Sequence, residues 1–302
     1  MTQPIIVLAG AAGDLGGRIA KALVARGAAV RALVRGEVSD ADKARLVQPG
    51  LTPTIVDMSD IGGVAAACEG AACVVSALSG LRGVIVDRQS LLLDAAVRAG
   101  VPRFIPSDYS ADFTRTTPGD NRNFDLRREF KARADLADIK VTSILNGAFM
   151  DMLGAEMPII QPRIRRVLYW GDADQKLDFT TKDDVAAYVA AASLDATTPR
   201  ILRIAGDTLS ASELAATLGR VTAERYRTLR VGGVGALGVM IDLARWIAPQ
   251  PDAVFPPWQG MQYMRDMFSG RGKLDPLDNA RYPDQTWTSV NALFEAARGT
   301  SR

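Results

Sequence analysis

The sequence predicts an α/β protein in which a doubly wound parallel sheet is followed by a smaller C-terminal region. Three observations indicate this fold class. Short, apolar, β-rich runs alternate with longer segments of helical periodicity over residues 1–106. A glycine-rich turn directly follows the first of these runs. All four tryptophans and most of the prolines lie elsewhere, within 147–177 and 207–302.

The alternation defines the expected elements of the sheet. The apolar runs at 4–9, 29–34, 54–56, 72–76 and 103–106 are the expected strands. Helices are expected between them, at 14–26, 40–47, 60–68 and 84–99. Gly100 and Pro102 mark the end of the last helix, since glycine commonly caps a helix C-terminus and proline cannot continue one. Strands separated by crossover helices of this kind pair in parallel.

Further elements follow a polar loop at 107–121. A charged helix is expected at 122–137, a strand at 140–145, a strand end and a helix at 178–195, and another strand at 199–204. Ser210 should open a helix at 210–221, because Glu213 three residues later completes a capping box. We therefore expect a first domain at 1–155, completed by about 178–206, and a smaller, discontinuous region at 156–302.

The amino-acid composition excludes several classes of function. Lys and Arg total 36 against 34 for Asp and Glu, so nothing favours a nucleic acid or an anionic membrane as partner. The first apolar run is too short for a signal peptide or a membrane span, and Cys68 and Cys73 lie in an apolar stretch typical of reduced, buried thiols. These features predict a cytoplasmic protein. The absence of histidine excludes Ser-His and Cys-His nucleophiles and the commonest metal ligand, and no metal site is expected.

The turn after the first strand has the spacing GxxGxxG. Gly10 would permit the tight turn, Gly13 the close approach of a pyrophosphate, and Gly16 the packing of helix on strand. Free N–H groups at the helix N-terminus would then face the phosphates. We expect a Rossmann-type dinucleotide site here that also includes Ala12, Asp14 and Leu15.

Other strand ends should contribute to the same site, because ligands of such sheets bind at the carboxyl ends of the strands. Arg35 ends the second strand, where NAD enzymes usually carry an acidic residue. Its guanidinium could pair with a 2′-phosphate, which favours NADP(H) over NAD(H), or it could be an ordinary solvated arginine. The remaining strand ends predict contacts from Asp57, Met58, Ser76, Ala77 and Leu78.

These residues resemble those of the NmrA-like atypical short-chain dehydrogenases, and among them the isoflavone reductase and phenylcoumaran benzylic ether reductase group. The resemblance is carried by the stretches 10–16, 32–35, 99–108, 142–149, 171–172 and 183–186, and it covers about 1–220. It implies an NADPH-binding Rossmann domain and a small C-terminal domain for the substrate. It also implies that Ser107, Asn146, Gly147 and Phe149 bind the cofactor.

The sequence departs from this family at a catalytic position. The family's catalytic lysine falls on Arg127, and an arginine does not exchange a proton near neutral pH. Lys131 lies one helical turn later and could act instead, or it could be one more charge on a solvated face. No tyrosine is followed four residues later by a lysine, so Tyr109 and Asp108 are the nearest other proton donors, although Tyr109 could simply pack the loop.

Two functions fit this pattern. One is an NADPH-dependent reductase of an aromatic or apolar carbonyl, quinone or ether, acting as a monomer or a homodimer. The other is a non-catalytic NAD(P)-binding sensor; a sugar-nucleotide epimerase is disfavoured by the missing Tyr-Lys pair. An apolar segment could line the substrate pocket or form a helix core: Trp258, Met261, Tyr263, Met264, Met267 and Phe268. The glycine-rich stretch 232–238 is expected to be a loop or a close helix contact and not a phosphate loop.

Overall fold

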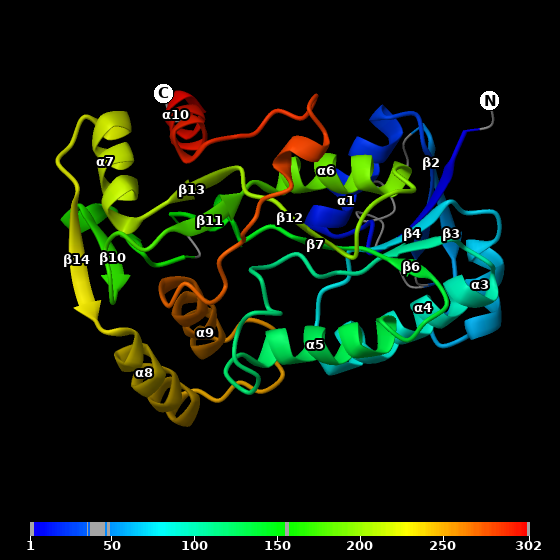
Figure 1. Ribbon diagram of the computed structural model, residues 1–302, viewed down its shortest axis with the longest axis horizontal. Helices are drawn as coiled ribbons and strands as arrows, with labels where there is room; N and C mark the ends of the chain where they lie inside the picture. Colours follow the sequence, from blue (N-terminus) through cyan, green and yellow to red (C-terminus); the bar gives the residue numbers. More distant parts are fainter. Residues whose placement is uncertain (1–2, 35, 37–45, 47–48, 155–156, 301–302) are drawn as a thin grey trace. The chain divides into compact units, whose positions relative to one another are not determined.

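The computed structural model describes residues 3–34, 36, 46, 49–154 and 157–300. The chain forms two compact units (Figure 1). The first consists of Met1–Tyr109, Leu126–Ile144 and Val185–Leu202, and the second of Ser110–Asp125, Leu145–Asp184 and Arg203–Arg302. The chain leaves the first unit three times, after Tyr109, Ile144 and Leu202, and it returns twice, each time within a helix.

The first unit contains a six-stranded sheet in the order β3-β2-β1-β4-β5-β6. Every neighbouring pair is parallel. The strands are β1 (Ile5–Ala9), β2 (Ala29–Val34), β3 (Leu51–Ile55), β4 (Cys73–Ser76), β5 (Arg103–Ile105) and β6 (Lys140–Val141). The strand order reverses between β1 and β4, which confirms the doubly wound fold and places the topological switch point at the ends of these two strands.

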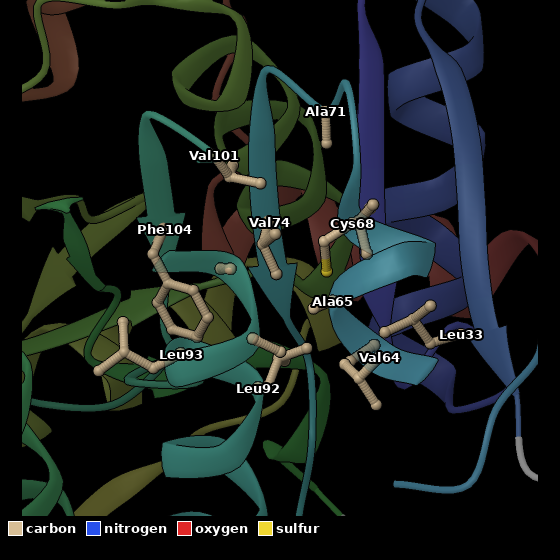
Figure 2. Close-up of a cluster of buried hydrophobic side chains, with 14 of the residues drawn as sticks. Leu33, Val64, Ala65, Cys68, Ala71, Val74, Leu92, Leu93, Val101 and Phe104 are labelled. Carbon is tan, nitrogen blue, oxygen red and sulfur yellow. The ribbon is translucent and has the colours of Figure 1, made fainter. Parts of the chain in front are cut away.

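Helices cover this sheet and supply its core (Figure 1). They are α1 (Asp14–Ala25), α3 (Ile61–Cys68), α4 (Gln89–Arg98), α5 (Arg122–Ala134) and α6 (Lys182–Leu194). Figure 2 shows part of the core, where Val64 and Cys68 of α3 and Leu92 of α4 meet Val74 of β4. Burial raises the pKa of Cys68 to about 11 and that of Cys73 to about 12, as expected for buried thiols. The helix expected at 40–47 lies outside the described residues except for Leu46.

Two expected elements differ in detail. The helix expected at 84–99 begins as a π-helix, Gly83–Arg88, in which the Gln89 backbone N–H bonds the Val84 carbonyl while its side chain bonds the Ile85 carbonyl. The strand expected at 140–145 is divided into β6 and β7 (Ser143–Leu145). The N–H of Thr142 still bonds β5, whereas that of Ser143 bonds the Arg200 carbonyl before β12 (Ile201–Arg203), so the chain changes partner between them.

The second unit is built from two three-stranded sheets, β14-β10-β9 and β13-β11-β8. Their strands are β8 (Ala148–Phe149), β9 (Ile160–Gln161), β10 (Arg166–Trp170), β11 (Leu177–Thr180), β13 (Asp207–Leu209) and β14 (Arg227–Gly232). The unit also holds α7 (Ala211–Thr222), α8 (Val234–Ile247), α9 (Pro257–Phe268) and α10 (Val290–Thr300), and short helical turns at Met150–Met152, Pro162–Ile164 and Asn279–Arg281. Phe179, Leu214 and Met267 belong to its apolar core.

Two local predictions for the second unit concern helix starts. The capping box of α7 is confirmed, since Ser210 Oγ accepts from the Glu213 N–H and Glu213 accepts from the Ser210 N–H. The stretch 232–238 spans the end of β14 and the first turn of α8, where a Cβ at Gly232 would lie 2.9 Å from the Ala236 side chain. Close packing therefore explains this glycine. No helix in the described ranges is long and apolar enough to cross a membrane.

Candidate functional site

The turn between β1 and α1 is shaped by backbone contacts that only glycine permits. Gly10 has φ +90°, and a Cβ on it would lie 2.6 Å from the Ala77 carbonyl oxygen. A Cβ on Gly16 would lie 2.0 Å from the Gly10 carbonyl oxygen. The Gly13 N–H closes the turn on the Gly10 carbonyl at 3.0 Å. Gly10 and Gly16 are thus fixed by the protein's own backbone.

Gly13 differs from these two glycines. A Cβ on it would meet one protein atom, the Gly10 carbonyl oxygen, at the tight but not prohibitive distance of 3.3 Å. Gly13 is also the N-cap of α1, and no side chain caps the helix there. The backbone N–H groups of Asp14 and Leu15 therefore open α1 next to the exposed Gly13, at the positive end of the helix dipole. This arrangement is suited to an anion.

The ends of β4 and β5 lie next to this turn. The Ala77 N–H bonds the Ala9 carbonyl at 2.8 Å, and Ser107 Oγ donates to the Leu78 carbonyl at 2.7 Å. Ser76 is fully buried, and its Oγ has no hydrogen-bond partner within the part of the chain that the structure describes. An unsatisfied buried hydroxyl costs about 1–3 kcal/mol, and this one lies at the switch point of the sheet.

Gln89, which the sequence reasoning missed, holds this edge in place. Its Oε1 accepts from the Ser107 N–H at 2.9 Å while its Nε2 donates to the Ile85 carbonyl at 3.1 Å. The side chain is fully buried. A glutamine within a helical segment gives no sequence signal for this role, because the π-helical turn that directs it toward Ser107 is a tertiary feature.

The end of β3 is followed by the exposed Asp57 and the half-buried Met58. The backbone N–H and then the hydroxyl of Ser59 donate to Asp57 Oδ1, at 2.8 and 2.7 Å, and hold the pKa of this carboxyl below its usual value. Met58 is half-buried and packs against the core of the first unit. Arg35, expected to select the 2′-phosphate, lies outside the described residues.

In the second unit, Asn146 has an orphaned side chain. It is fully buried, and neither its Nδ2 nor its Oδ1 has a hydrogen-bond partner among the residues described. Its backbone is held firmly, since its N–H bonds the Ser110 carbonyl and its carbonyl accepts from Thr180 Oγ1 at 2.7 Å. Gly147 follows with φ +70°, and a Cβ there would lie 2.3 Å from the Asp178 carbonyl oxygen. Two buried amide atoms without a partner in the described ranges thus stand on a fixed backbone, which is rare in folded proteins.

Phe149 follows two residues later in β8. Its side chain is half-buried, and its backbone pairs in register with Thr180 of β11. β8 therefore ties the Asn146 loop to the sheet.

A chain of contacts links α5 to Asp108 within the first unit. Lys131 Nζ pairs with Asp135 Oδ2 at 2.6 Å, and Arg200 Nε pairs with Asp135 Oδ1 at 2.8 Å. Arg200 Nη1 donates to Ser143 Oγ at 2.7 Å, and Ser143 Oγ donates to Asp108 Oδ2 at 2.6 Å. Lys131 is thus an ion-paired residue, and the arginine in the chain prevents a proton relay from it to Asp108.

The side chains of Asp108 and Tyr109 are both buried. Burial raises the pKa of Asp108, while the Ser143 hydrogen bond and the charges of Arg127, Arg200 and Lys131 act to lower it. Burial, and then the electrostatic influence of Asp108, raises the pKa of Tyr109. The Tyr109 hydroxyl has no hydrogen-bond partner in the described ranges, and the phenol keeps its proton. Arg127 is close enough for its charge to act on Asp108.

The apolar segment expected to line a pocket or to form a core lies on α9. Four of its six side chains are buried: Trp258, Met264, Met267 and Phe268. Phe268 contacts Trp170 with ring centroids 5.6 Å apart, and Tyr263 meets Phe124 edge-on at 5.0 Å. The core alternative therefore accounts for most of this segment.

One cavity in the first unit lies apart from the glycine turn. It is an open groove of about 630 Å³ between α3, α4 and α5, and it is lined by Ser59, Ile61, Val86, Asp87, Ser90, Leu91, Asp94, Glu129 and Arg133. Three carboxylates face a single arginine there, so the groove is unsuited to a dinucleotide despite its size.

Comparison with known proteins assigns the family. The model of the NmrA-like family matches residues 1–270. The chain belongs to the NmrA-like family. This confirms the resemblance seen in the glycine turn and the later stretches.

Several curated proteins are similar to this NmrA-like chain. Pinoresinol reductase 2 of Arabidopsis thaliana is 30% identical over 199 residues, which is 61% of this chain and 63% of that protein. Phenylcoumaran benzylic ether reductase IRL1 of Ginkgo biloba is 25% identical over 230 residues, covering 72% and 74% respectively. The chain thus spans about 63% of the length of the first of these relatives.

Solved structures share the fold along nearly the whole chain. The structure of AtPrR2 with NADP+ and (+)pinoresinol has a TM-score of 0.83 at 23% identity and covers 98% of this chain and 99% of its own. A crystal structure of isoflavone reductase gives 0.82 at 20% identity, covering 98% and 100%. These likenesses confirm the fold of the NmrA-like chain.

Lys273 is a second residue that sequence reasoning missed. Its Nζ pairs with Asp178 Oδ1 at 2.5 Å and donates to the Leu274 carbonyl at 3.1 Å. Asp178 is buried, and with Lys273 it borders a small cavity that Gly147 also lines. A single lysine among glycines has no periodic signal, so only the folded second unit places this amine beside Gly147.

Proposed function

We propose that the protein is an NADP(H)-dependent reductase that transfers a hydride to an aromatic or apolar carbonyl, quinone or ether. The observation that carries the proposal is the α1 turn, where Gly10 and Gly16 are fixed by backbone contacts while the Gly13 helix start has no side-chain cap. The names of the relatives support the chemistry, since they are pinoresinol and phenylcoumaran benzylic ether reductases.

The residues fit the cofactor. The backbone N–H groups of Asp14 and Leu15 would hold the pyrophosphate, and the Ser76 hydroxyl and Ser107 would bind near the middle of the cofactor. Arg35 would pair with the 2′-phosphate and favour NADP(H) over NAD(H). The family resemblance gives Asn146, Gly147 and Phe149 to the same cofactor, and the orphaned Asn146 amide supports a polar contact there. AtPrR2, whose fold this chain shares, was solved with NADP+.

The cofactor supplies the hydride, and the chain must orient the substrate and stabilise the developing oxyanion. Arg127 can do this as a permanent positive charge while solvent provides the proton. Lys131 is less suited, because its ammonium is held by Asp135 at 2.6 Å. Asp108 and Tyr109 are further candidates as proton donors, since both side chains keep their protons to higher pH than usual.

A direct test is to follow the absorbance of reduced cofactor while NADPH is incubated with aromatic ketones, quinones and benzylic ethers. We expect turnover of at least one class. A second candidate, a non-catalytic NAD(P)-binding sensor, is favoured by one observation, the arginine at position 127 in place of the family's lysine. Tight NADPH binding without turnover of any of these substrates would support the sensor and contradict the reductase.

A further inference from the structure

A buried side-chain amide joins separate segments of the first unit at the edge of the sheet where the glycine turn lies. Gln89 is fully buried at the start of α4. Its Oε1 accepts from the Ser107 N–H, after β5, at 2.9 Å, and its Nε2 donates to the carbonyl of Ile85 in the π-helical turn at 3.1 Å. Both partners are backbone groups, and their chemistry fixes the orientation of the amide, because an N–H needs an acceptor and a carbonyl needs a donor.

The π-helical turn leaves the Ile85 carbonyl to this amide. In a regular α-helix the backbone N–H of Gln89 would bond the carbonyl four residues earlier, which is that of Ile85. Here the N–H reaches the carbonyls of Val84 and Val86 instead, and the Gln89 side chain takes the Ile85 carbonyl. Turns of this kind are frequent at functional sites. The widened turn and the glutamine therefore depend on each other.

Ser107 carries the same contact on to the end of β4. Its Oγ donates to the carbonyl of Leu78, two residues beyond β4, at 2.7 Å. The hydroxyl proton is committed there, so the Ser107 oxygen can meet a ligand only as an acceptor. Gly80, on the same loop as Leu78, lies against the π-helical turn, since a Cβ on it would stand 2.6 Å from the Val84 side chain. Gln89 and its turn thus set the spacing between the ends of β4 and β5.

The loop after β4 also contacts the glycine turn. The Ala77 N–H bonds the Ala9 carbonyl at 2.8 Å. The Ala77 carbonyl oxygen is the atom that would lie 2.6 Å from a Cβ on Gly10. A shift of the Leu78 backbone would therefore reach the glycine turn through its neighbour Ala77.

We propose that Gln89 is a positioning residue for the dinucleotide: its amide holds Ser107 and the π-helical turn, and so fixes the strand ends that receive the cofactor. This inference rests on the proposed NADP(H) site. Both polar atoms of the Gln89 side chain are engaged within the protein, so the residue acts through Ser107 and not on the ligand. Without the amide, the Ser107 N–H and the Ile85 carbonyl would each lose a hydrogen-bond partner, and the strand ends would no longer be held at one spacing.

The first test is calorimetric titration of the full chain with NADP+, alongside urea denaturation. Gln89→Met keeps an unbranched side chain of similar length but removes both hydrogen bonds, and it should weaken NADP+ binding by about three- to tenfold. Leu92→Ala is the matched control, because Leu92 is a fully buried residue of the same helix that packs in the apolar core (Figure 2). It should lose at least as much stability and keep its affinity for NADP+.

The variant Gln89→Glu separates positioning from stability. A protonated carboxyl copies the amide, since its carbonyl oxygen can accept from Ser107 and its hydroxyl can donate to Ile85. An ionised carboxylate has no proton to donate and repels the Ile85 carbonyl. Burial raises the pKa of a carboxyl in such a place. The NADP+ affinity of this variant should therefore match that of the wild type at about pH 5 and fall about three- to tenfold below it by about pH 8.

The ratio to the wild type isolates the introduced carboxyl. The charged groups nearest in the chain are Asp87 and Arg88 of the π-helical turn and Asp108 after Ser107. All three are present in the wild type, as is the ionisation of the cofactor's own phosphates, so their effects cancel in the ratio. For Gln89→Met the ratio should not depend on pH.

The proposal is overturned if Gln89→Met binds NADP+ as the wild type does, if Leu92→Ala loses as much affinity, or if the ratio for Gln89→Glu does not change with pH. Should Gln89→Met fail to fold, the pH profile of Gln89→Glu decides alone. A wild type that binds no NADP+ would refute the proposed function, and this inference with it. That failure is distinct, because it appears before any variant is compared.

Discussion

The turn before α1 is shaped by backbone contacts, whereas the charged face of α5 is shaped by ion pairs between long side chains. In the turn, Gly10 and Gly16 are required by backbone atoms that would lie 2.6 and 2.0 Å from a Cβ, whereas Gly13 has no contact closer than 3.3 Å. On α5, the charged groups stand at the ends of long side chains and depend on pairing: Lys131 pairs with Asp135 one helical turn later, and Asp135 pairs with Arg200, which is 65 residues away in the sequence. A site made of backbone can be predicted from sequence, whereas a site made of flexible charges cannot.

The largest effect should come from Arg127→Ala. Loss of one oxyanion contact reduces kcat by about 10² to 10³, and NADPH affinity should change little. Lys131→Ala should slow turnover less, since Lys131 is ion-paired with Asp135. Steady-state kinetics of both variants decides this. Equal, small losses would remove α5 from catalysis and direct attention to Asp108 and Tyr109.

Gly13→Asp should abolish cofactor binding without unfolding the protein. A carboxylate about 4 Å from a phosphate costs about 1–4 kcal/mol, which is up to a thousandfold in affinity. Calorimetric titration with NADPH measures it. Gly83→Asp is the control, since a Cβ at Gly83 has no neighbour within 4 Å. Retained affinity in the folded variant would show that the turn is only structural.

Gly16→Ala should instead destabilise the fold. Its Cβ would lie 2.0 Å from the Gly10 carbonyl oxygen, and overpacking of this kind costs about 1–3 kcal/mol. At Gly17, one residue along the same helix, the nearest contact would be 3.5 Å, so Gly17→Ala should be neutral or slightly stabilising. Urea denaturation compares the two. Similar midpoints would contradict the steric account of the turn.

The preference for NADPH over NADH should fall by about ten- to a hundredfold in Arg35→Ala, because a charge-assisted hydrogen bond contributes about 1.5–3 kcal/mol. Affinities of both cofactors for wild type and variant measure this. Equal binding of the two cofactors by the wild type would refute the interpretation of the second strand end.

The smallest effect concerns Asp135. Burial raises the pKa of this carboxyl, but the hydrogen bonds from Lys131 and Arg200 outweigh it and leave the pKa below its ordinary value. A carboxyl with a depressed folded-state pKa stabilises the fold above its unfolded pKa and loses this as pH falls through the folded value. Asp135→Asn should therefore cost under about 1 kcal/mol at neutral pH, since the group is partly exposed.

Urea midpoints of wild type and Asp135→Asn should converge as the pH drops below the ordinary value of 3.8. A difference independent of pH would mean that the contribution of Asp135 is not ionic.

Sequence patterns predicted the parallel sheet and the glycine turn before α1 more completely than the other elements. Alternation of apolar runs located all five expected strands of the sheet, because parallel strands are buried on both faces. The capping box of α7 was local and was predicted in full. The break at Thr142 and the π-helical turn before α4 were missed, because each depends on partners far away in the chain, at Arg200 and at Ser107.

By itself, the sequence determined where the chain turns, which glycines the α1 turn needs, and the family to which the protein belongs. These depend on backbone sterics and on the period of apolar residues, and both are local. Tertiary structure alone decided that the Ser76 and Asn146 side chains have no hydrogen-bond partner among the described residues, and that Asp135 is paired with Arg200. Burial and pairing of side chains depend on contacts between distant segments, which no local pattern encodes.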